Sequence, residues 1–539
     1  MTIGRRTAIA LGALAALTVS LTPLSPAAAS PAAAPAAAPG GTINWAPCPE
    51  NPAVDCGSLT LPINRDDPAS PTFELAVARI KATDPAARQG SLVFNPGGPG
   101  GEGVGMLIYG GNMFSAEVNR RFDIIGFDPR GVGRSSPVRC SLEVLMRGPS
   151  AFPGNQADFD ALVAHNKERR ADCRTRTGPM FDHVDTVSTV HDLDALRAAL
   201  GDEKLTYYGV SYGTLIGQLY AERYPGRIRA LAIDGNMDHS LNTRGFLDTE
   251  AWAVQDSFNA FVKWCGGSAD CALNGKDVRA VWSDLLQRAD RGELRSITPP
   301  ESTYTRMHLI SEAFGAFYGS DLRPLATFLR DLDRDGRADP PSYPAAAAAA
   351  AAQEVIVDYP MEIFCQDWRL PVRNYREFAR HVRRSEAISP DMGPSPLALS
   401  AVAGCLGHSD PVKYPQRPLR VKGTPPLLVS STLHDPATPY IWATSAARQI
   451  GRAARLLTHE GGGHGVYGHG QCATTAVDNY LISLTVPAHG TRCATDPPGT
   501  AAKLDIGRPM PRPVTGLPGS PGSPGLPGSP GLPGWAVRR

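Results

Sequence analysis

Short apolar runs, nearly unbroken by charge, alternate along this chain with segments of helical pattern. The clearest runs are 91–95 (SLVFN), 122–128 (FDIIGFD), 205–210 (LTYYGV) and 228–235 (IRALAIDG). A strand with one solvated face alternates apolar and polar residues, so continuous apolar runs predict strands covered on both faces. The segment 187–201 has helical pattern and ends on a glycine where a C-cap is expected. This alternation predicts an α/β fold with a mostly parallel sheet.

The strand pattern breaks in the second half of the chain and then returns. Residues 240–420 have mainly helical pattern, whereas strand character reappears at 426–432 and 455–460. An insertion between late strands of a parallel sheet predicts a helical cap over the carboxyl edge of the strands. The sequence thus divides into a first core part (42–239), a cap (240–420) and a C-terminal core part (421–495).

The first residues have the pattern of an export signal. Arg5 and Arg6 precede an apolar stretch over 7–21, and Ala27-Ala28-Ala29 forms a small-residue cleavage site. We predict a signal peptide at 1–29 and therefore a secreted protein. The alternative, a membrane anchor, is disfavoured because the apolar stretch is short for a spanning helix. Residues 30–41 are predicted to be an Ala/Pro-rich leader or pro-segment, and 496–539 a flexible Gly/Pro-rich tail.

Charge is almost balanced along the 539 residues. Lysine and arginine total 53 against 52 acidic residues, giving a formal net charge of +1. No long run of one sign occurs, so neither nucleic acid nor an anionic membrane is an expected partner after signal cleavage. The sequence gives no prediction of oligomeric state.

All ten cysteines lie downstream of the predicted signal, as expected of disulfides in an oxidising compartment. No C-x-x-C spacing is present, so no zinc site is predicted, and the sequence calls for no other metal or cofactor. Local spacing suggests three pairs and elimination leaves two: Cys48–Cys56, Cys265–Cys271, Cys472–Cys493, Cys140–Cys173 and Cys365–Cys405.

A Gly-x-Ser-x-Gly motif at 209–213 places Ser211 between a predicted strand and a predicted helix, where a nucleophile is expected. A serine hydroxyl needs a histidine to take its proton and an acid to orient that histidine. The chain order in strand–turn–helix hydrolases is serine, acid, histidine. Asp435 and His464 each follow one of the last two predicted strands, so they are the predicted partners. The alternatives left open are Asp234 as the acid and His434, His459 or His469 as the base.

An oxyanion intermediate needs two backbone donors. We predict that Tyr212, directly after the nucleophile, supplies one N–H and that Gly98, in the glycine-rich loop 91–103, supplies the other. The spacing of glycines in this loop also mimics a dinucleotide-binding fingerprint, but Pro99 removes a donor that a pyrophosphate would need. A second stretch, 331–342, begins like a calcium loop but has Ser342 where the bidentate glutamate belongs, so we expect a surface loop there.

Several motifs occur together in a characteristic order. NPGGPG, DPRGVGRSS (128–136), GVSYG, HDPATP and GGGHG, with the C-terminal cysteines, resemble the secreted tripeptidyl aminopeptidases of actinobacteria, relatives of the proline iminopeptidases. The resemblance covers about 42–495. It implies an α/β-hydrolase fold with a helical cap, no cofactor, peptide substrates and release of tripeptides from free N-termini. It also implies Ser211, Asp435 and His464 as the triad and a cleaved pro-segment.

An exopeptidase of this kind needs an anion that faces the free ammonium of its substrate. The predicted cap segment 354–370 has acids among apolar and aromatic residues, and we predict Asp367 and Glu362 as the amine-binding pair. The alternative is that both are ordinary surface or salt-bridged acids. Two other functions stay open: a proline-type aminopeptidase or general esterase or amidase of the same fold, and a non-catalytic binding protein.

Overall fold

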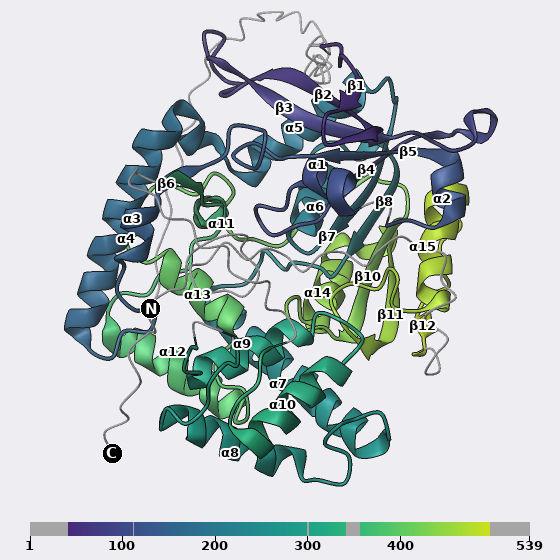
Figure 1. The fold of residues 1–539 in the computed structure, drawn as a ribbon. Helices are drawn as coiled ribbons and strands as arrows, with labels where there is room; N and C mark the ends of the chain where they lie inside the picture. The colour runs from purple at the N-terminus through teal and green to yellow at the C-terminus, as the bar shows by residue number, and fades with distance from the viewer. Residues whose placement is uncertain (1–40, 111–112, 299–300, 341–355, 496–539) are drawn as a thin grey trace, which may run out of the picture. The chain divides into compact units, whose positions relative to one another are not determined.

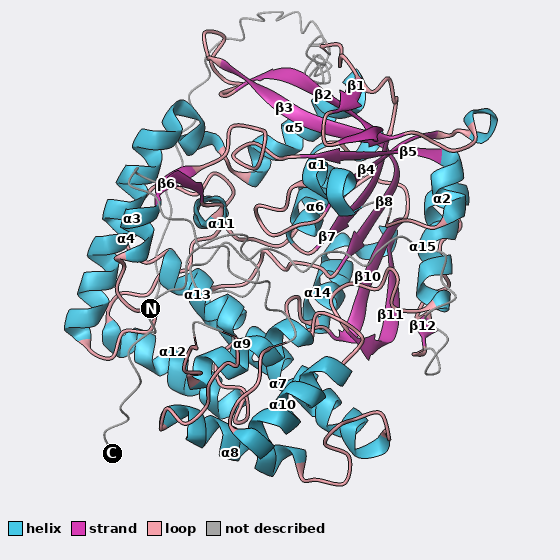
Figure 2. Cartoon of the chain, in the orientation of Figure 1, coloured by secondary structure: helices cyan, strands magenta, loops and turns pink. Residues whose placement is uncertain are grey.

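The structure, a computed structural model, describes residues 41–110, 113–298, 301–340 and 356–495. The predicted signal peptide, almost all of the leader and the predicted tail lie outside these residues. Within them, one sheet of ten strands forms the centre of the molecule (Figures 1 and 2). Its strands, in spatial order, are β1 (Ala46–Cys48), β2 (Asn51–Pro62), β3 (Thr72–Ile80), β5 (Phe122–Phe127), β4 (Gly90–Asn95), β7 (Leu205–Val210), β8 (Ile228–Asp234), β10 (Leu427–His434), β11 (Ala454–Gly462) and β12 (Arg492–Cys493).

The sheet is antiparallel at one end and parallel through the rest. Strands β1, β2, β3 and β5 pair antiparallel, whereas every pair from β5 onward through β4 to β12 is parallel. Parallel strands end at the same edge, so the loops that follow β4, β7, β8, β10 and β11 gather at one side of the sheet. The predicted α/β fold with a mostly parallel sheet is confirmed.

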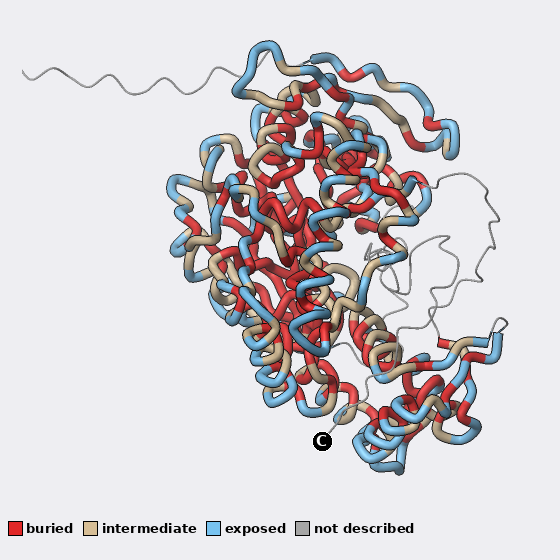
Figure 3. Tube along the Cα trace, turned by 90° about the vertical axis from the view of Figure 1, so that its left-hand side faces the viewer, coloured by how far each residue is buried: buried red, intermediate tan, exposed pale blue. Residues whose placement is uncertain are grey.

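Burial on both faces explains the continuous apolar runs. Every residue of β4, β5 and β7 is buried. Successive side chains point to opposite faces of a sheet, and those of β4 divide accordingly between two hydrophobic cores. Val93 packs with residues of α5 (Thr186–Ala199) and α6 (Tyr212–Arg223). Leu92 and Phe94 instead pack with residues of α2 (Ala116–Arg121) and α15 (Gln471–Ser483). Figure 3 shows the buried positions concentrated in the interior, with the exposed ones outside.

Helices outside the insertion come from both ends of the chain. Local caps define several of them: Asp185, for example, accepts a hydrogen bond from the Ser188 N–H at 3.0 Å and starts α5, which Gly201 follows with φ +79°. These helices are α1 (Gly103–Gly105), α2 (Ala116–Arg121), α3 (Leu142–Met146), α4 (Gln156–Thr177), α5 (Thr186–Ala199), α6 (Tyr212–Arg223), α14 (Tyr440–Ile450) and α15 (Gln471–Ser483). Short helical turns are η1 (Pro85–Ala87), η2 (Met106–Gly110), η3 (Gly178–His183), η4 (Pro225–Arg227) and η5 (Gly451–Ala453).

The helices of the insertion predicted as a cap contribute to more than one hydrophobic core. They are α7 (Thr243–Gly267), α8 (Val278–Asp290), α9 (Arg306–Ala316), α10 (Arg323–Asp335), α11 (Met361–Asp367), α12 (Tyr375–Ile388) and α13 (Pro396–Gly404). Helices α7 to α10 supply most of one core and lie together in Figure 1, while Phe246 and Leu247 of α7 belong to the core that contains the sheet. Helices α11 and α13 instead contribute Ile363, Phe364 and Val402 to the core that contains the sheet. A short strand, β9 (Ile356–Asp358), also pairs with β6 (Arg139–Ser141) outside the insertion.

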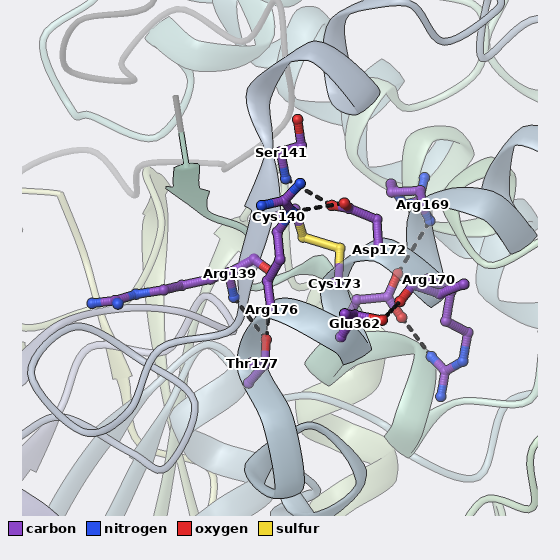
Figure 4. The surroundings of a disulfide bond; sticks show 12 residues. Arg139, Cys140, Ser141, Arg169, Arg170, Asp172, Cys173, Arg176, Thr177 and Glu362 are labelled. Atoms are coloured by element: carbon purple, nitrogen blue, oxygen red, sulfur yellow. Dashed lines mark hydrogen bonds and ion pairs between the residues drawn. A yellow bond between two sulfur atoms is a disulfide. The ribbon is translucent and has the colours of Figure 1, made fainter. Parts of the chain in front are cut away.

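All ten cysteines are paired, in the five predicted pairs. Two bridges bear on the site described below. Cys140–Cys173 joins β6 to α4 (Figure 4), and Cys365–Cys405 joins α11 to the end of α13. Because Cys365 lies two residues before Asp367, this second bridge fixes the backbone from which that acid projects.

The segment predicted as a surface loop at 331–342 begins as helix. Asp331, Asp333 and Asp335 lie in the last turns of α10, and Gly336 ends that helix in the left-handed conformation. Asp333 pairs with Lys276 at 2.6 Å, and the other two aspartates pair with neighbouring arginines. The expectation of a loop is therefore wrong for these residues, because the apolar face of α10 packs into the core of the insertion.

Among the residues that the structure describes, no helix is both long enough and apolar enough to cross a membrane.

Candidate active site

Ser211 occupies a sharp turn between β7 and α6. Its φ of 58° and ψ of −124° lie in a region that residues other than glycine rarely adopt. The positions two residues to either side of Ser211 must be glycine because a side chain would not fit there. A Cβ at Gly209 would lie 2.6 Å from the Gly213 carbonyl oxygen, and one at Gly213 would lie 2.7 Å from Asn95 Oδ1. This geometry is that of a nucleophile elbow, which presents the serine hydroxyl at the edge of the sheet.

Asp435 and His464 are in direct contact. His464 Nδ1 lies 3.0 Å from both carboxylate oxygens of Asp435. The Asp435 carboxylate also accepts hydrogen bonds from the N–H groups of Ala437 and Thr438 at 2.9 and 2.8 Å. With Nδ1–H donated to the carboxylate, Nε2 keeps its lone pair, and it has no hydrogen-bond partner within the described residues. The ring is therefore oriented to accept a proton at Nε2.

The carboxyl ends of four neighbouring parallel strands bring these residues to one edge. Ser211 follows β7, Asp435 follows β10 and His464 follows β11. The Ser211 N–H donates to the carbonyl of Asp234, the last residue of β8, at 3.0 Å. The Asp234 side chain accepts from the Val466 N–H at 2.8 Å, two residues past His464. Asp234 thus links the serine turn to the histidine loop.

The alternative assignments of acid and base are disfavoured by these contacts. The Asp234 carboxylate binds the Tyr208 hydroxyl at 2.5 Å and loop N–H groups, not the His464 ring. His459 lies within β11, as predicted for it, and His434 is bonded to Asp256 at 2.7 Å. Burial lowers the pKa of His469 to about 4.

We expect activity to rise with pH through a midpoint above 6.5. Burial by itself disfavours the charged His464 ring, but the charge and the hydrogen bond of Asp435, with a contribution from Asp234, outweigh it and raise the pKa of His464 above its ordinary value of 6.5. Only the neutral ring accepts the serine proton, so the inactive protonated form persists to higher pH than for an ordinary histidine. A profile of kcat/KM from pH 5 to 9 measures this, and a midpoint clearly below 6.5 would contradict the assignment.

The glycine loop after β4 packs against the serine turn. A Cβ at Gly97 would lie 2.9 Å from both Ser211 Cβ and the Tyr212 nitrogen. The Gly97 N–H is bonded to Asn95 Oδ1 at 3.0 Å, whereas the Gly98 N–H has no acceptor in the described part of the chain. The Tyr212 N–H is the first of α6 and has no acceptor within that helix. The two predicted oxyanion donors thus come from adjoining segments.

The two acids predicted to bind a substrate amine both have other partners. Glu362 is buried between two arginines of α4: one carboxylate oxygen contacts Arg169 at 3.3 Å and the other contacts Arg170 (Figure 4). Asp367 is 2% exposed and accepts hydrogen bonds from Thr186 and Tyr212. These contacts favour the alternative that Glu362 is a salt-bridged acid. They also place Asp367 beside Tyr212, which directly follows Ser211.

Sequence reasoning missed several residues around the triad. Thr438 Oγ1 donates to Asp435 at 3.0 Å, and the Tyr318 ring lies edge-on to the His464 ring, with centroids 5.0 Å apart. The run DPAT, typical of a turn closed by an aspartate side chain, is the signal that could have indicated Thr438. Tyr318 and the fully buried Glu250 belong to the insertion. No local motif connects either of them to the triad.

The fold, the Ser211 turn and the Asp435–His464 contact define the class of protein. Residues 90–469 match the family described as alpha/beta hydrolase fold, and the chain belongs to that family. With Ser211 on the elbow and the Asp435–His464 pair at the same sheet edge, it is a serine hydrolase.

Named relatives narrow the class further. The chain is 34% identical over 484 residues to the serine protease Hip1 of Mycobacterium tuberculosis, covering 84% of this chain and 91% of that one. It is 32% identical over 480 residues to the tripeptidyl aminopeptidase of Streptomyces lividans, covering 84% and 86%. It is also 30% identical over 468 residues to carboxylesterase B of Mycobacterium tuberculosis, covering 81% and 86%. The resemblance to tripeptidyl aminopeptidases is confirmed. With the Mycobacterium and Streptomyces peptidases as relatives, the chain belongs with the serine peptidases of the α/β-hydrolase fold.

Proposed function

We propose that this protein is a secreted serine exopeptidase that releases tripeptides from the free N-termini of peptides and proteins. The contact between Asp435 and His464 beside the Ser211 elbow carries the hydrolytic part of the proposal. The relatives named as serine protease and tripeptidyl aminopeptidase support the peptidase part. Residues 1–29 would direct export, and the leader that follows would be removed as a pro-segment.

Peptide cleavage would proceed through an acyl-enzyme. Ser211 Oγ attacks the carbonyl carbon of the third residue while His464 Nε2 takes the hydroxyl proton. The N–H groups of Tyr212 and Gly98 hold the resulting oxyanion. The C–N bond then breaks, and the imidazolium gives its proton to the departing amine. Water, deprotonated by the same ring, attacks the ester carbon. The ester C–O bond then breaks, the ring returns its proton to Ser211 Oγ, and the tripeptide leaves.

We propose that Glu250, in α7, binds the N-terminal ammonium of the substrate. This carboxyl is fully buried; Oε2 accepts a hydrogen bond from Ser395 at 2.9 Å, and Oε1 has no partner among the described residues. Burial raises the pKa of Glu250 well above its ordinary value, and the negative charge of Asp435 raises it further. A neighbouring ammonium would supply the missing partner and stabilise the carboxylate. Glu250 thus replaces Asp367 and Glu362 as the candidate for this role.

Free and N-acetylated tripeptidyl p-nitroanilides of the same sequence test the exopeptidase proposal. The free substrate should be cleaved with at least a hundredfold higher kcat/KM, and mass spectrometry of digested longer peptides should show tripeptides as the released products. Glu250→Gln should raise KM for the free substrate about 10- to 100-fold, the worth of a hydrogen bond to a charged group. It should change hydrolysis of a small ester far less.

A general esterase is the second candidate function, favoured by the relative named carboxylesterase B. Equal cleavage of blocked and free peptides, or cleavage of esters alone, would support the esterase and contradict the exopeptidase.

A further inference from the structure

We propose that Asp367 is a positioning residue that fixes Tyr212 and thereby the backbone donor at the start of α6. The inference rests on the proposed oxyanion role of the Tyr212 N–H. It gives the C-terminal residue of α11, a helix of the insertion, a part in the hydrolytic step itself.

A closed set of hydrogen bonds surrounds the Asp367 carboxylate. Oδ1 accepts the Thr186 N–H at 2.8 Å, and Oδ2 accepts both the Thr186 hydroxyl at 2.7 Å and the Tyr212 hydroxyl. The Thr186 and Tyr212 hydroxyl oxygens also lie within hydrogen-bond distance of each other. All three residues are at most 5% exposed, so water does not compete for these groups.

The position of Asp367 is itself held from several directions. Its backbone carbonyl accepts a hydrogen bond from His239 Nε2 at 2.8 Å, and the Cys365–Cys405 bridge lies two residues earlier. Burial and the nearby negative charge of Asp185 raise the pKa of Asp367 to about 7. This carboxyl is kept buried despite that cost, and the described groups that donate to it belong to Tyr212 and Thr186. This is the arrangement expected of a fixed anchor.

Tyr212 connects Asp367 to the active site, because Asp367 holds its side chain and its backbone N–H is a predicted oxyanion donor. It directly follows Ser211, whose strained backbone must hold the hydroxyl and the next N–H together. An oxyanion donor has to lie within about 0.5 Å of its productive place, and loss of one donor costs about 10²–10³ in kcat. The side chain of Tyr212 is fixed at its far end by Asp367, while its backbone opens the helix. A shift of this ring would therefore move the N–H that faces the oxyanion.

Asp367→Asn and Tyr212→Phe test the proposal on two substrates: p-nitrophenyl acetate and a free tripeptidyl p-nitroanilide. Each substitution should lower kcat about 10-fold or more on both substrates and change KM by less than about twofold. The double variant should be little worse than either single one, because both remove the same contact. Thr186→Val, which removes one donor to the same carboxylate, should show the same pattern in milder form.

A matched pair of controls lies on the same helix. Tyr220 of α6 donates its hydroxyl to buried Asp194 at 3.0 Å, eight positions and about 12 Å further along the helix. Asp194→Asn and Tyr220→Phe should lower Tm without lowering kcat. If Asp367→Asn behaves like these controls, or if it raises KM only for the free peptide, the positioning role is wrong.

If Asp367→Asn does not fold, Thr186→Val and Tyr212→Phe still test the proposal. Normal kcat in both variants would overturn it. The ester readout also separates this inference from the peptidase assignment. A wild type that hydrolyses the ester but no free peptide would contradict the exopeptidase, while the effect of Asp367→Asn on ester kcat would still decide the role of Asp367.

Discussion

Replacing Ser211 with alanine should lower kcat by about 10⁵–10⁶-fold, and His464→Ala should cost nearly as much. The serine supplies the bond-forming oxygen, and without the ring its proton has no acceptor. Because the two residues act as one unit, the double variant should be little worse than either single variant. Activity that remains would come from the oxyanion donors and substrate binding alone.

Steady-state rates on p-nitrophenyl acetate and on a free tripeptidyl p-nitroanilide measure this effect, with circular dichroism and Tm as checks on folding. His459→Gln is a suitable control, because His459 lies within β11 and outside the triad. If the losses at Ser211 and His464 multiplied in the double variant, the two residues would not act as a unit.

Asp435→Asn should lower kcat about 10⁴-fold, whereas Asp234→Asn should lower it about 10-fold or less. An asparagine at 435 can present its amide N–H to Nδ1, which favours the wrong tautomer of His464. Asp234 instead fixes the loop that follows the histidine, through the Val466 and Tyr467 N–H groups, and its loss would loosen that loop.

The comparison of these two variants identifies the acid. Both side chains are at most 1% exposed and lie at the same sheet edge, so burial alone does not separate them. In the pH profile, Asp435→Asn should also move the acidic midpoint downward, because the nearby negative charge is gone. Near-full activity in Asp435→Asn with abolition in Asp234→Asn would reverse the assignment.

Local sequence patterns were sufficient for the central strands of the sheet. The predicted strands 91–95, 205–210 and 228–235 correspond to β4, β7 and β8 within one residue at either end. Strands buried on both faces have a continuous apolar signal, and that signal does not depend on distant parts of the chain. Asp435 and His464 could be predicted for the same reason, since each directly follows such a strand.

Contacts between distant segments were not predictable in the same way. Glu362 and Asp367 have the composition expected of an amine site, but their partners lie on α4 and at the starts of α5 and α6, up to 193 residues away in sequence. No local pattern shows that Arg169 and Arg170 will take the Glu362 carboxylate. Glu250 was missed because a single acid in an amphipathic helix gives no sign of whether it is buried or paired.

The sequence also could not predict which hydrophobic core each helix of the insertion joins. Helix α10 packs inside the insertion, whereas helix α11 packs on the core that contains the sheet. Which core a helix joins depends on the surface that the rest of the chain offers. Periodicity predicts that a face will be buried but not against which partner.

Labelling with a fluorophosphonate followed by peptide mapping tests the central claim most directly. The reagent reacts with a serine only when a neighbouring base activates it, and it does not depend on peptide specificity. We predict a single phosphonylated residue, Ser211, in the wild type, no labelling in Ser211→Ala, and strongly slowed labelling in His464→Ala. An inert wild type, or a label on another residue that persists in Ser211→Ala, would contradict the account.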